Sequence, residues 1–218
     1  SLPNLMGLDN LNSIGGSLSI SENSSLASLS GFDNLTSVGR SLWIEGNYNL
    51  TSIAALENLT AIVENLAVIG TWDLTSLSGL DNVTSVGGNL KIERNSSLTS
   101  LSGLENLTSI ASGIFFYYNN SLTSLSELDN LSSFIGGDLS IRYNTALTNL
   151  LAFDNLTTIG GSLLIESMNG ISSLSGLNNI SCVGRDLYIN SNSSLPSFSG
   201  LDNLSFVGRD IEIYGNSI

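Results

Sequence analysis

Apolar residues return along this chain with a period of 24 residues. In the stretch Gly79–Ser102 they occupy positions 2, 5, 8, 12, 14, 20 and 23, counted from the opening glycine. The same positions are apolar in the other copies, which open at Gly7, Gly31, Ala55, Gly103, Glu127, Ala152, Gly176 and Gly200. The copy that opens at Glu127 has 25 residues, and we interpret Ile135 as the inserted residue, which should bulge from its coil. A repeat of this length is typical of a solenoid, in which each coil stacks on its neighbours.

Short strands are the elements that the spacing within one repeat predicts. Positions 12 and 14, such as Leu90 and Ile92, have the two-residue spacing of a strand with one buried face. Apolar residues then recur at every third residue from Leu98 to Ile110, and the intervening Ser, Thr, Asn and Gly are weak helix formers. We therefore expect an all-β fold over residues 1–218, as a single solenoid domain of about nine coils. Each coil should contain about three short strands, and neighbouring coils should pair in parallel about 4.8 Å apart.

Glycine and asparagine also recur in register. Position 9 is Gly in most copies, for example Gly39 and Gly184, and we expect a corner there that needs a positive φ. Position 4 is Asn in all nine copies, and position 17 is Asn in seven. Asparagine side chains aligned at strand spacing can hydrogen-bond from coil to coil, so both columns predict asparagine ladders.

The repeat resembles two related families. The segment L-x-I-x-x-N-x-x-L at Leu90–Leu98 resembles the leucine-rich repeat, and the longer run NLTSIGG-S-L-x-I-x-x-N-x-x-L-T-S-L is similar to receptor L-domains. The resemblance implies a right-handed, leucine-rich parallel β-helix. Receptor L-domains occur in growth-factor receptor ectodomains, in fungal GPI-anchored cell-wall proteins and in bacterial surface repeat proteins, which implies an extracellular or cell-surface location. Growth-factor binding is not carried over, because cysteine-rich modules and disulfide caps are missing from this sequence.

Charge and composition exclude several functions. The net charge of −13, from 19 acidic and 6 basic residues, argues against a nucleic-acid partner. No apolar run approaches the roughly 20 residues of a spanning helix, so we expect no direct membrane insertion. The chain has no histidine to act as a general base, and its single cysteine, Cys182, has no imidazole partner. We therefore expect a protein that is not an enzyme and needs no cofactor or metal.

Two polar columns allow a functional as well as a structural interpretation. Position 3 is acidic in eight copies, which could bind calcium or could form a solvated acidic edge. Positions 6, 7, 21 and 22 carry stacked hydroxyls, such as Thr84 and Thr108, which would suit either ice binding or close stacking of coils. We favour the structural interpretation of both columns.

The candidate binding site lies where otherwise similar copies differ most. Positions 13 and 15 point outward if 12 and 14 point inward, and with position 16 they carry most of the aromatic and cationic side chains outside the core. Such residues anchor interfaces, so we interpret them as a surface for a protein or carbohydrate partner, the alternative being ordinary cross-strand packing in a structural wall protein or adhesin stalk. The candidate residues are Trp43, Lys91, Arg94, Phe115, Tyr117, Tyr118, Arg142, Tyr143 and Tyr188.

The two ends of the sequence fall at similar places within a coil. Neither end shows a polar cap, so we expect the chain to be a piece of a longer surface protein. Coils without caps would also allow end-to-end self-association.

Overall fold

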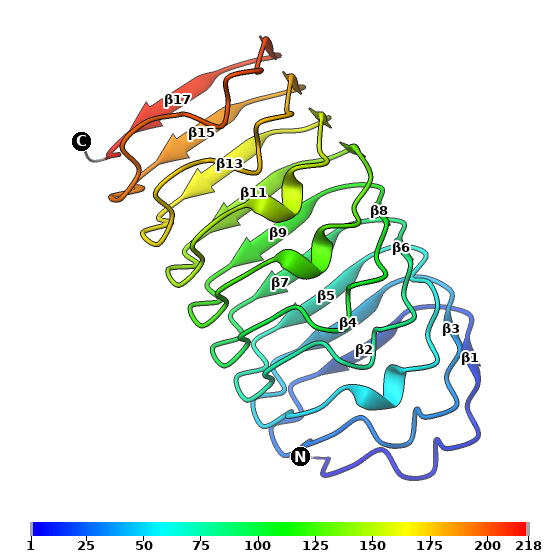
Figure 1. Cartoon of the computed structure of the whole chain (residues 1–218). Helices are drawn as coiled ribbons and strands as arrows, with labels where there is room; N and C mark the ends of the chain where they lie inside the picture. The colour runs from blue at the N-terminus through cyan, green and yellow to red at the C-terminus, as the bar shows by residue number, and fades with distance from the viewer. Residues whose placement is uncertain (1, 217–218) are drawn as a thin grey trace.

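A stack of coils built on one long parallel sheet forms the molecule (Figure 1). The computed structural model describes residues 2–216. The main sheet has nine parallel strands, in the order β17-β15-β13-β11-β9-β7-β5-β4-β2. Their bounds are β2 Leu18–Ser21, β4 Leu42–Glu45, β5 Leu66–Ile69, β7 Leu90–Glu93, β9 Ile114–Tyr117, β11 Leu139–Arg142, β13 Leu163–Glu166, β15 Leu187–Asn190 and β17 Ile211–Tyr214. The all-β, leucine-rich solenoid predicted from the repeat is therefore confirmed.

A second side of the stack carries strands of only two residues. They pair in parallel as β1–β3, as β6–β8 and as β10–β12–β14–β16. Their bounds are β1 Ser13–Ile14, β3 Ser37–Val38, β6 Ser85–Val86, β8 Ser109–Ile110, β10 Phe134–Ile135, β12 Thr158–Ile159, β14 Cys182–Val183 and β16 Phe206–Val207. In the coil that opens at Ala55, Ile62 forms only single bridges to Val38 and Val86, and Val63 is exposed, as expected for a distorted corner.

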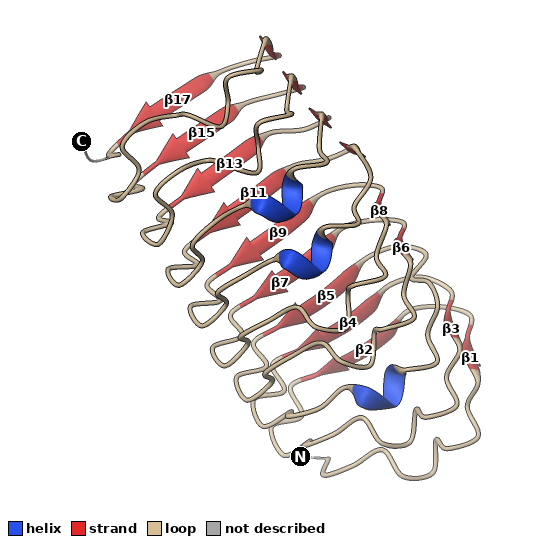
Figure 2. Cartoon of the chain, in the orientation of Figure 1, coloured by secondary structure: helices blue, strands red, loops and turns tan. Residues whose placement is uncertain are grey.

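The third side of each coil is built of turns, so the expectation of about three strands per coil was wrong. Figure 2 shows loops along this side, interrupted by three short helices. These are 3-10 helices: η1 Ala54–Leu56, η2 Ser126–Leu128 and η3 Leu151–Phe153. The leucines at every third residue still point inward, because successive turns rather than strands separate them, as in the bond from the Leu107 N–H to the Leu104 carbonyl (3.0 Å).

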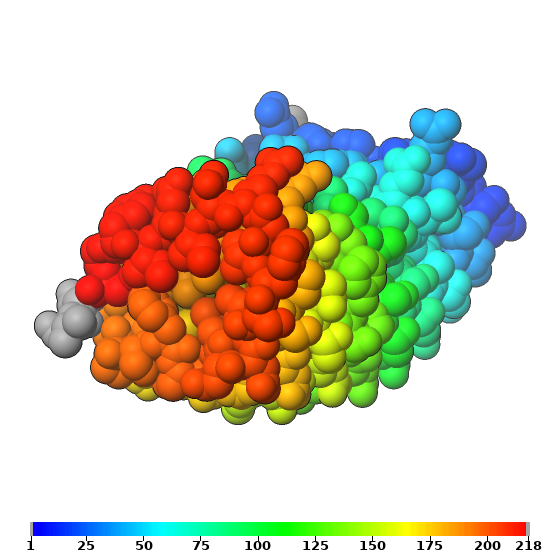
Figure 3. Space-filling model, turned by 90° about the horizontal axis from the view of Figure 1, so that it is seen from above, coloured from blue at the N-terminus to red at the C-terminus, as the bar shows by residue number. Residues whose placement is uncertain are grey.

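The core is a set of aligned apolar columns. Leu90 pairs in register with Leu66 and with Ile114, and Ile92 pairs with Val68 and with Phe116. All seven apolar positions of the repeat Gly79–Ser102 are at most 1% exposed. Burial of a Leu or Ile side chain contributes about 1.5–3 kcal/mol, so repetition of this set stabilises the stack. The space-filling view shows the coils packed side by side in chain order (Figure 3).

The opening residue of each coil determines its turn. The six opening glycines have φ between +100° and +116°, a region that glycine enters without steric cost. The three copies that open with Ala55, Glu127 and Ala152 instead are those that form η1, η2 and η3. A residue with a Cβ avoids the left-handed conformation, and a turn of 3-10 helix replaces it.

Glycine at position 9 has a different cause from the one that the sequence suggested. These glycines do not have a positive φ. A Cβ on Gly184 would instead lie 2.3 Å from the carbonyl oxygen of Gly160, and one on Gly39 would lie 2.6 Å from that of Gly15. The prediction of a positive φ was therefore wrong, and close approach of neighbouring coils explains the glycine.

The additional residue in the sixth coil is not Ile135. Ile135 pairs in register with Ile159 and is only 1% exposed, whereas Phe134 is 53% exposed. Ser133 accepts hydrogen bonds from both Thr157 and Thr158, so the coil widens just before β10. The prediction that Ile135 bulges was wrong, because an isoleucine matches the Ile and Val side chains that fill this slot in the following coils.

Both asparagine ladders are present. At position 17, Asn119 donates to the carbonyl of Ile92 at 2.9 Å and accepts from the N–H of Asn95 at 3.1 Å. Asn95 and Asn144 repeat this arrangement, and all three side chains are buried, which excludes glycosylation at Asn95 and Asn119 in the folded chain. At position 4 the asparagines are exposed rather than inward-facing, yet each donates to the previous coil, as Asn106 does to the Asp81 carbonyl at 2.7 Å.

Candidate functional site

The outer face of the main sheet carries the residues that the sequence singled out. Here "outer face" means the side chains at positions 13 and 15 of the nine strands. Strand pairing sets Lys91 beside Phe115, and Glu93 beside Tyr117, about 4.8 Å apart. Trp43, Lys91, Phe115, Tyr117, Arg142 and Tyr188 are all half-buried by such neighbours. They therefore form one continuous surface, which consists of two hollows, a ridge and a rim.

The first hollow lies towards the N-terminal half of the outer face. It has a volume of about 340 Å³. Its lining comes from β4, β5, β7 and β9 and the turns before them, and consists of Trp43, Asn65, Leu66, Ala67, Asn89, Lys91, Phe115 and Tyr117. The hollow exists because Ala67 is small, whereas the residues in its column on either side, Trp43 and Lys91, are large.

A second polar column supports the first hollow. Asn65 accepts hydrogen bonds from both the backbone and the side-chain nitrogen of Asn89, and Asn89 accepts one from Gly113 at 2.8 Å. These amides are position 11 of their coils, just before the main strand. They hold the edge of the hollow in place, and their oxygens are already in use.

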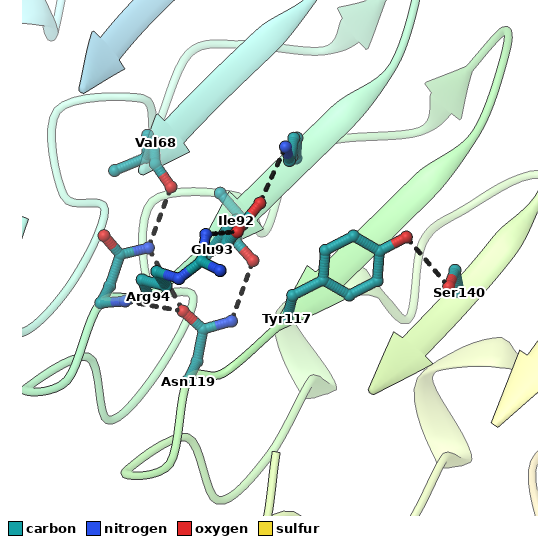
Figure 4. Close-up of polar contacts among 9 residues, drawn as sticks. Val68, Ile92, Glu93, Arg94, Tyr117, Asn119 and Ser140 are labelled. Atoms are coloured by element: carbon teal, nitrogen blue, oxygen red, sulfur yellow. Dashed lines mark hydrogen bonds and ion pairs between the residues drawn. The ribbon is translucent and has the colours of Figure 1, made fainter. Parts of the chain in front are cut away.

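A ridge closes the first hollow on its C-terminal side. The Tyr117 hydroxyl donates to the Ser140 hydroxyl at 3.1 Å (Figure 4). Arg142 Nε donates to the same oxygen at 3.1 Å, and its guanidinium lies 5.8 Å from the centre of the Tyr117 ring. Phe115 meets Tyr117 edge to face, with ring centroids 6.1 Å apart. Small Ser140 thus lets the two larger side chains converge and fix each other.

The cations of this surface are not free charges. Glu93 is almost fully buried and pairs with Lys91 at 2.8 Å and with Arg94 (Figure 4). Arg142 Nη1 lies 3.5 Å from Glu166. The surface that the sequence described as aromatic and cationic is therefore aromatic and close to neutral between β7 and β11.

The rim is a stack of three side chains at position 16. Tyr118 and Tyr143 lie face to face, with ring centroids 4.5 Å apart and an interplanar angle of 1°. The Arg94 guanidinium lies 5.2 Å from the centre of the Tyr118 ring, as in a cation–π pair. The stack follows the main strands at the corner, next to the ridge, and the Tyr118 side remains exposed.

The backbone under the rim is left-handed. Arg94, Tyr118 and Tyr143 have φ of 55° to 57°, and position 16 is left-handed in all nine coils. Three coils place Gly46, Gly70 and Gly215 there. A non-glycine residue in this conformation costs about 1–2 kcal/mol, so the rim keeps large side chains where glycine would suit the backbone better.

Glu166 connects the rim with the second half of the outer face. The Tyr143 hydroxyl donates to Glu166 at 2.9 Å, and this hydrogen bond, together with the charge of the carboxylate, raises the pKa of Tyr143 above its ordinary value of 10.0. The other Glu166 oxygen faces Arg142.

The second hollow lies beyond this carboxylate. Its volume is about 430 Å³, and its lining residues are Arg142, Leu164, Glu166, Tyr188, Asn190 and Tyr214. The structure thus distributes the predicted site: Trp43, Lys91, Phe115 and Tyr117 line the first hollow, Arg94, Tyr118 and Tyr143 form the rim, and Arg142 and Tyr188 line the second hollow.

Sequence reasoning missed an aromatic pair next to the rim. Tyr48 and Trp72 are exposed, with ring centroids 4.3 Å apart. Both occupy position 18, and both coils have Gly at position 16, so the Tyr48 ring can lie beside Gly70. The signal was available in the sequence, because the other residues at position 18 are small and polar.

The alternative polar columns have structural roles. At position 3, Asp81 accepts from the Gly79 N–H at 2.7 Å, and Asp33 and Asp202 bind their own opening glycines in the same way. Within residues 2–216, no three acidic or cysteine side chains are grouped as metal ligands. At position 6, the Thr108 hydroxyl donates to the Thr84 carbonyl at 3.1 Å, so this hydroxyl is used between coils.

A comparison with known families decides the identity of the fold. Residues 60–134 match the family described as "Receptor L domain". The middle of the chain is a receptor L domain. This match spans β6 to β9, the first hollow's C-terminal wall and part of the rim, and it confirms the resemblance inferred from the repeat.

Other comparisons add little about function. No curated protein matches the chain. Among solved structures the chain is similar to an internalin (inlF) from Listeria monocytogenes, at 20% identity over 90% of this chain and 82% of that chain, with a TM-score of 0.27. A likeness at this level supports no conclusion about a partner. In the described part of this receptor L domain protein, no helix has the length and hydrophobicity to cross a membrane.

Proposed function

We propose that this protein is a non-catalytic binding module of the extracellular space or cell surface. It recognises a protein partner through the outer face of its main sheet and the adjoining rim. The receptor L domain match supports the protein-binding class and the location. The observation that carries the proposed site is the rim, where Arg94, Tyr118 and Tyr143 stack on a left-handed backbone.

The chemistry of this surface suits a protein interface. Exposed tyrosine, tryptophan and arginine are the residue types that dominate binding energy, and a hollow beside them can seat an apolar side chain of the partner. The internal pairing of Lys91 and Arg94 with Glu93 lowers the cost of desolvating them, because an ion pair that stays satisfied leaves no charge unpaired.

Rigidity also favours this function. Parallel pairing on both sides holds β7, β9 and β11, and the ridge fixes Tyr117 through the Ser140 hydroxyl. Fixed aromatic side chains lose little conformational entropy when a partner binds. The face therefore presents a preformed surface.

A binding screen tests the proposal. The purified chain and its Tyr117→Ala variant are applied to arrays of extracellular proteins and of glycans. Protein spots that are lost with Tyr117→Ala support the proposal. Glycan spots that are lost with the variant indicate a carbohydrate partner instead, and a chain that binds nothing on either array is a structural stalk. End-to-end self-association stays a prediction, which sedimentation at increasing concentration tests.

A further inference from the structure

The second hollow contains a polar atom without a partner. Asn190 is 5% exposed, and no protein group among residues 2–216 bonds its side-chain oxygen. Strand pairing places Asn190 between Glu166 on one side and Tyr214 on the other, in the floor of the hollow. A buried oxygen without a hydrogen bond is costly, and it calls for a donor from outside the chain.

Two aromatic rings flank this oxygen. Tyr188 and Tyr214 both line the hollow, and Tyr188 pairs in register with Leu164 and with Glu212. Exposed tyrosine faces attract cations within about 6 Å of the ring centre. The hollow thus offers an acceptor oxygen next to two surfaces that suit a flat or cationic group.

The charge around the hollow is negative. The carboxylate of Glu212 raises the pKa of Tyr188, and burial and the charges of Asp186 and Asp210 add to the shift. Glu166 lines the hollow itself. The one cation in the lining, Arg142, is engaged on the ridge side, where it bonds Ser140 and lies against Glu166 and Tyr117. The side near Tyr188 and Asn190 therefore has unbalanced negative charge.

We propose that the second hollow receives an arginine side chain of the protein partner. Its guanidinium donates to the Asn190 oxygen and to Glu166, and its planar group lies against Tyr188 or Tyr214. A guanidinium supplies five donors and stacks on aromatic rings, which matches one free acceptor, a carboxylate and two rings. This inference rests on the proposed function, and it names the chemistry by which part of the same outer face selects its partner.

A small probe tests the hollow without a protein partner. N-acetyl-arginine methylamide is titrated into the isotope-labelled chain, and NMR follows the Asn190 side-chain amide and the rings of Tyr188 and Tyr214. We expect saturable shifts at these groups, weakened by added salt. N-acetyl-glutamate methylamide, the anionic control, should leave them unchanged. No shift with the arginine probe, or equal shifts with the glutamate probe, overturns the inference.

Variants separate binding from folding. Asn190→Leu should weaken the probe by about tenfold or more, because a charged hydrogen bond is lost, while thermal stability stays the same or rises, because an unpaired buried oxygen is removed. Glu212→Gln, at an exposed site, should also weaken the probe, and it serves if Asn190→Leu does not fold. Tyr117→Ala, in the first hollow, should bind the probe as the parent chain does. Unchanged affinity in both Asn190→Leu and Glu212→Gln contradicts the inference.

The result is distinguishable from failure of the proposed function. If the probe binds but the protein arrays stay empty, the hollow recognises a guanidinium and the protein partner is wrong. If an array partner binds Asn190→Leu as tightly as the parent chain, the binding module stands and the arginine inference fails.

Discussion

Tyr118 and Tyr143 lie face to face with ring centroids 4.5 Å apart, on two successive coils whose backbones are both left-handed at these residues. The solenoid itself explains the spacing, because parallel coils repeat at about the separation of stacked rings. It does not explain the choice of tyrosine, since Gly46 and Gly70 meet the same backbone demand in earlier coils. The pair therefore points to a role outside the fold.

Close approach of coils at position 9 gives a prediction with an internal control. Gly184→Ala should destabilise the chain by more than about 1 kcal/mol, because its Cβ would lie 2.3 Å from the Gly160 carbonyl oxygen. Gly15→Ala, in the same column, meets nothing within 4 Å and should be neutral or slightly stabilising. Urea unfolding of both variants checks this, and equal stabilities would show that coil contact does not require the glycine.

The buried asparagine ladder should be worth more than the exposed one. Asn119→Ala leaves the Asn95 N–H and the Ile92 carbonyl without partners in the interior, so we expect a loss of about 2–4 kcal/mol. Asn106→Ala removes one exposed bond, to Asp81, and should cost about 1 kcal/mol. Chemical denaturation measures both, and a larger loss for Asn106→Ala would contradict the assignment of the ladders.

The bond between Tyr143 and Glu166 predicts a pH dependence. The pKa of Tyr143 is raised in the folded chain above 10.0, so its contribution to stability is fully present below pH 10 and is lost as the pH rises through the folded pKa. Glu166→Gln should move the ionisation of one tyrosine back towards 10.0 and reduce this loss. Tyrosinate absorbance during alkaline titration reports the change, with Tyr143→Phe identifying the residue. An unchanged titration in Glu166→Gln would refute the bond.

Much of the fold could be predicted from the sequence because it is written in repeated columns. The inward position of Leu90 and Ile92 follows from their spacing, and the ladder at Asn119 follows from recurrence at strand distance. The additional residue was misplaced because Phe134 and Ile135 are both apolar, and only packing distinguishes them. The positive φ was assigned to the wrong glycine because two glycine columns exist and only one of them turns left-handed.

The candidate site was predicted in composition but not in geometry. The outward position of Phe115 and Tyr117 follows from alternation along a strand. The rim could not be foreseen, because position 16 carries Glu, Gly, Arg, Tyr and Ser without a common type that would mark a left-handed residue. The pairing of Lys91 with Glu93 was foreseeable, since residues two apart on a strand share a face.

The affinity of Tyr118→Gly for a protein partner tests the central claim most directly, with Glu22→Gly as its matched control. Both residues are left-handed and exposed, so glycine suits both backbones, and the free energy of unfolding should change by less than about 1 kcal/mol in either variant. Loss of the exposed ring should weaken binding by about 30-fold or more, as for a central interface aromatic residue, whereas Glu22→Gly should bind as the parent chain does. Full affinity in Tyr118→Gly would contradict the claim that the rim of this receptor L domain is its binding surface.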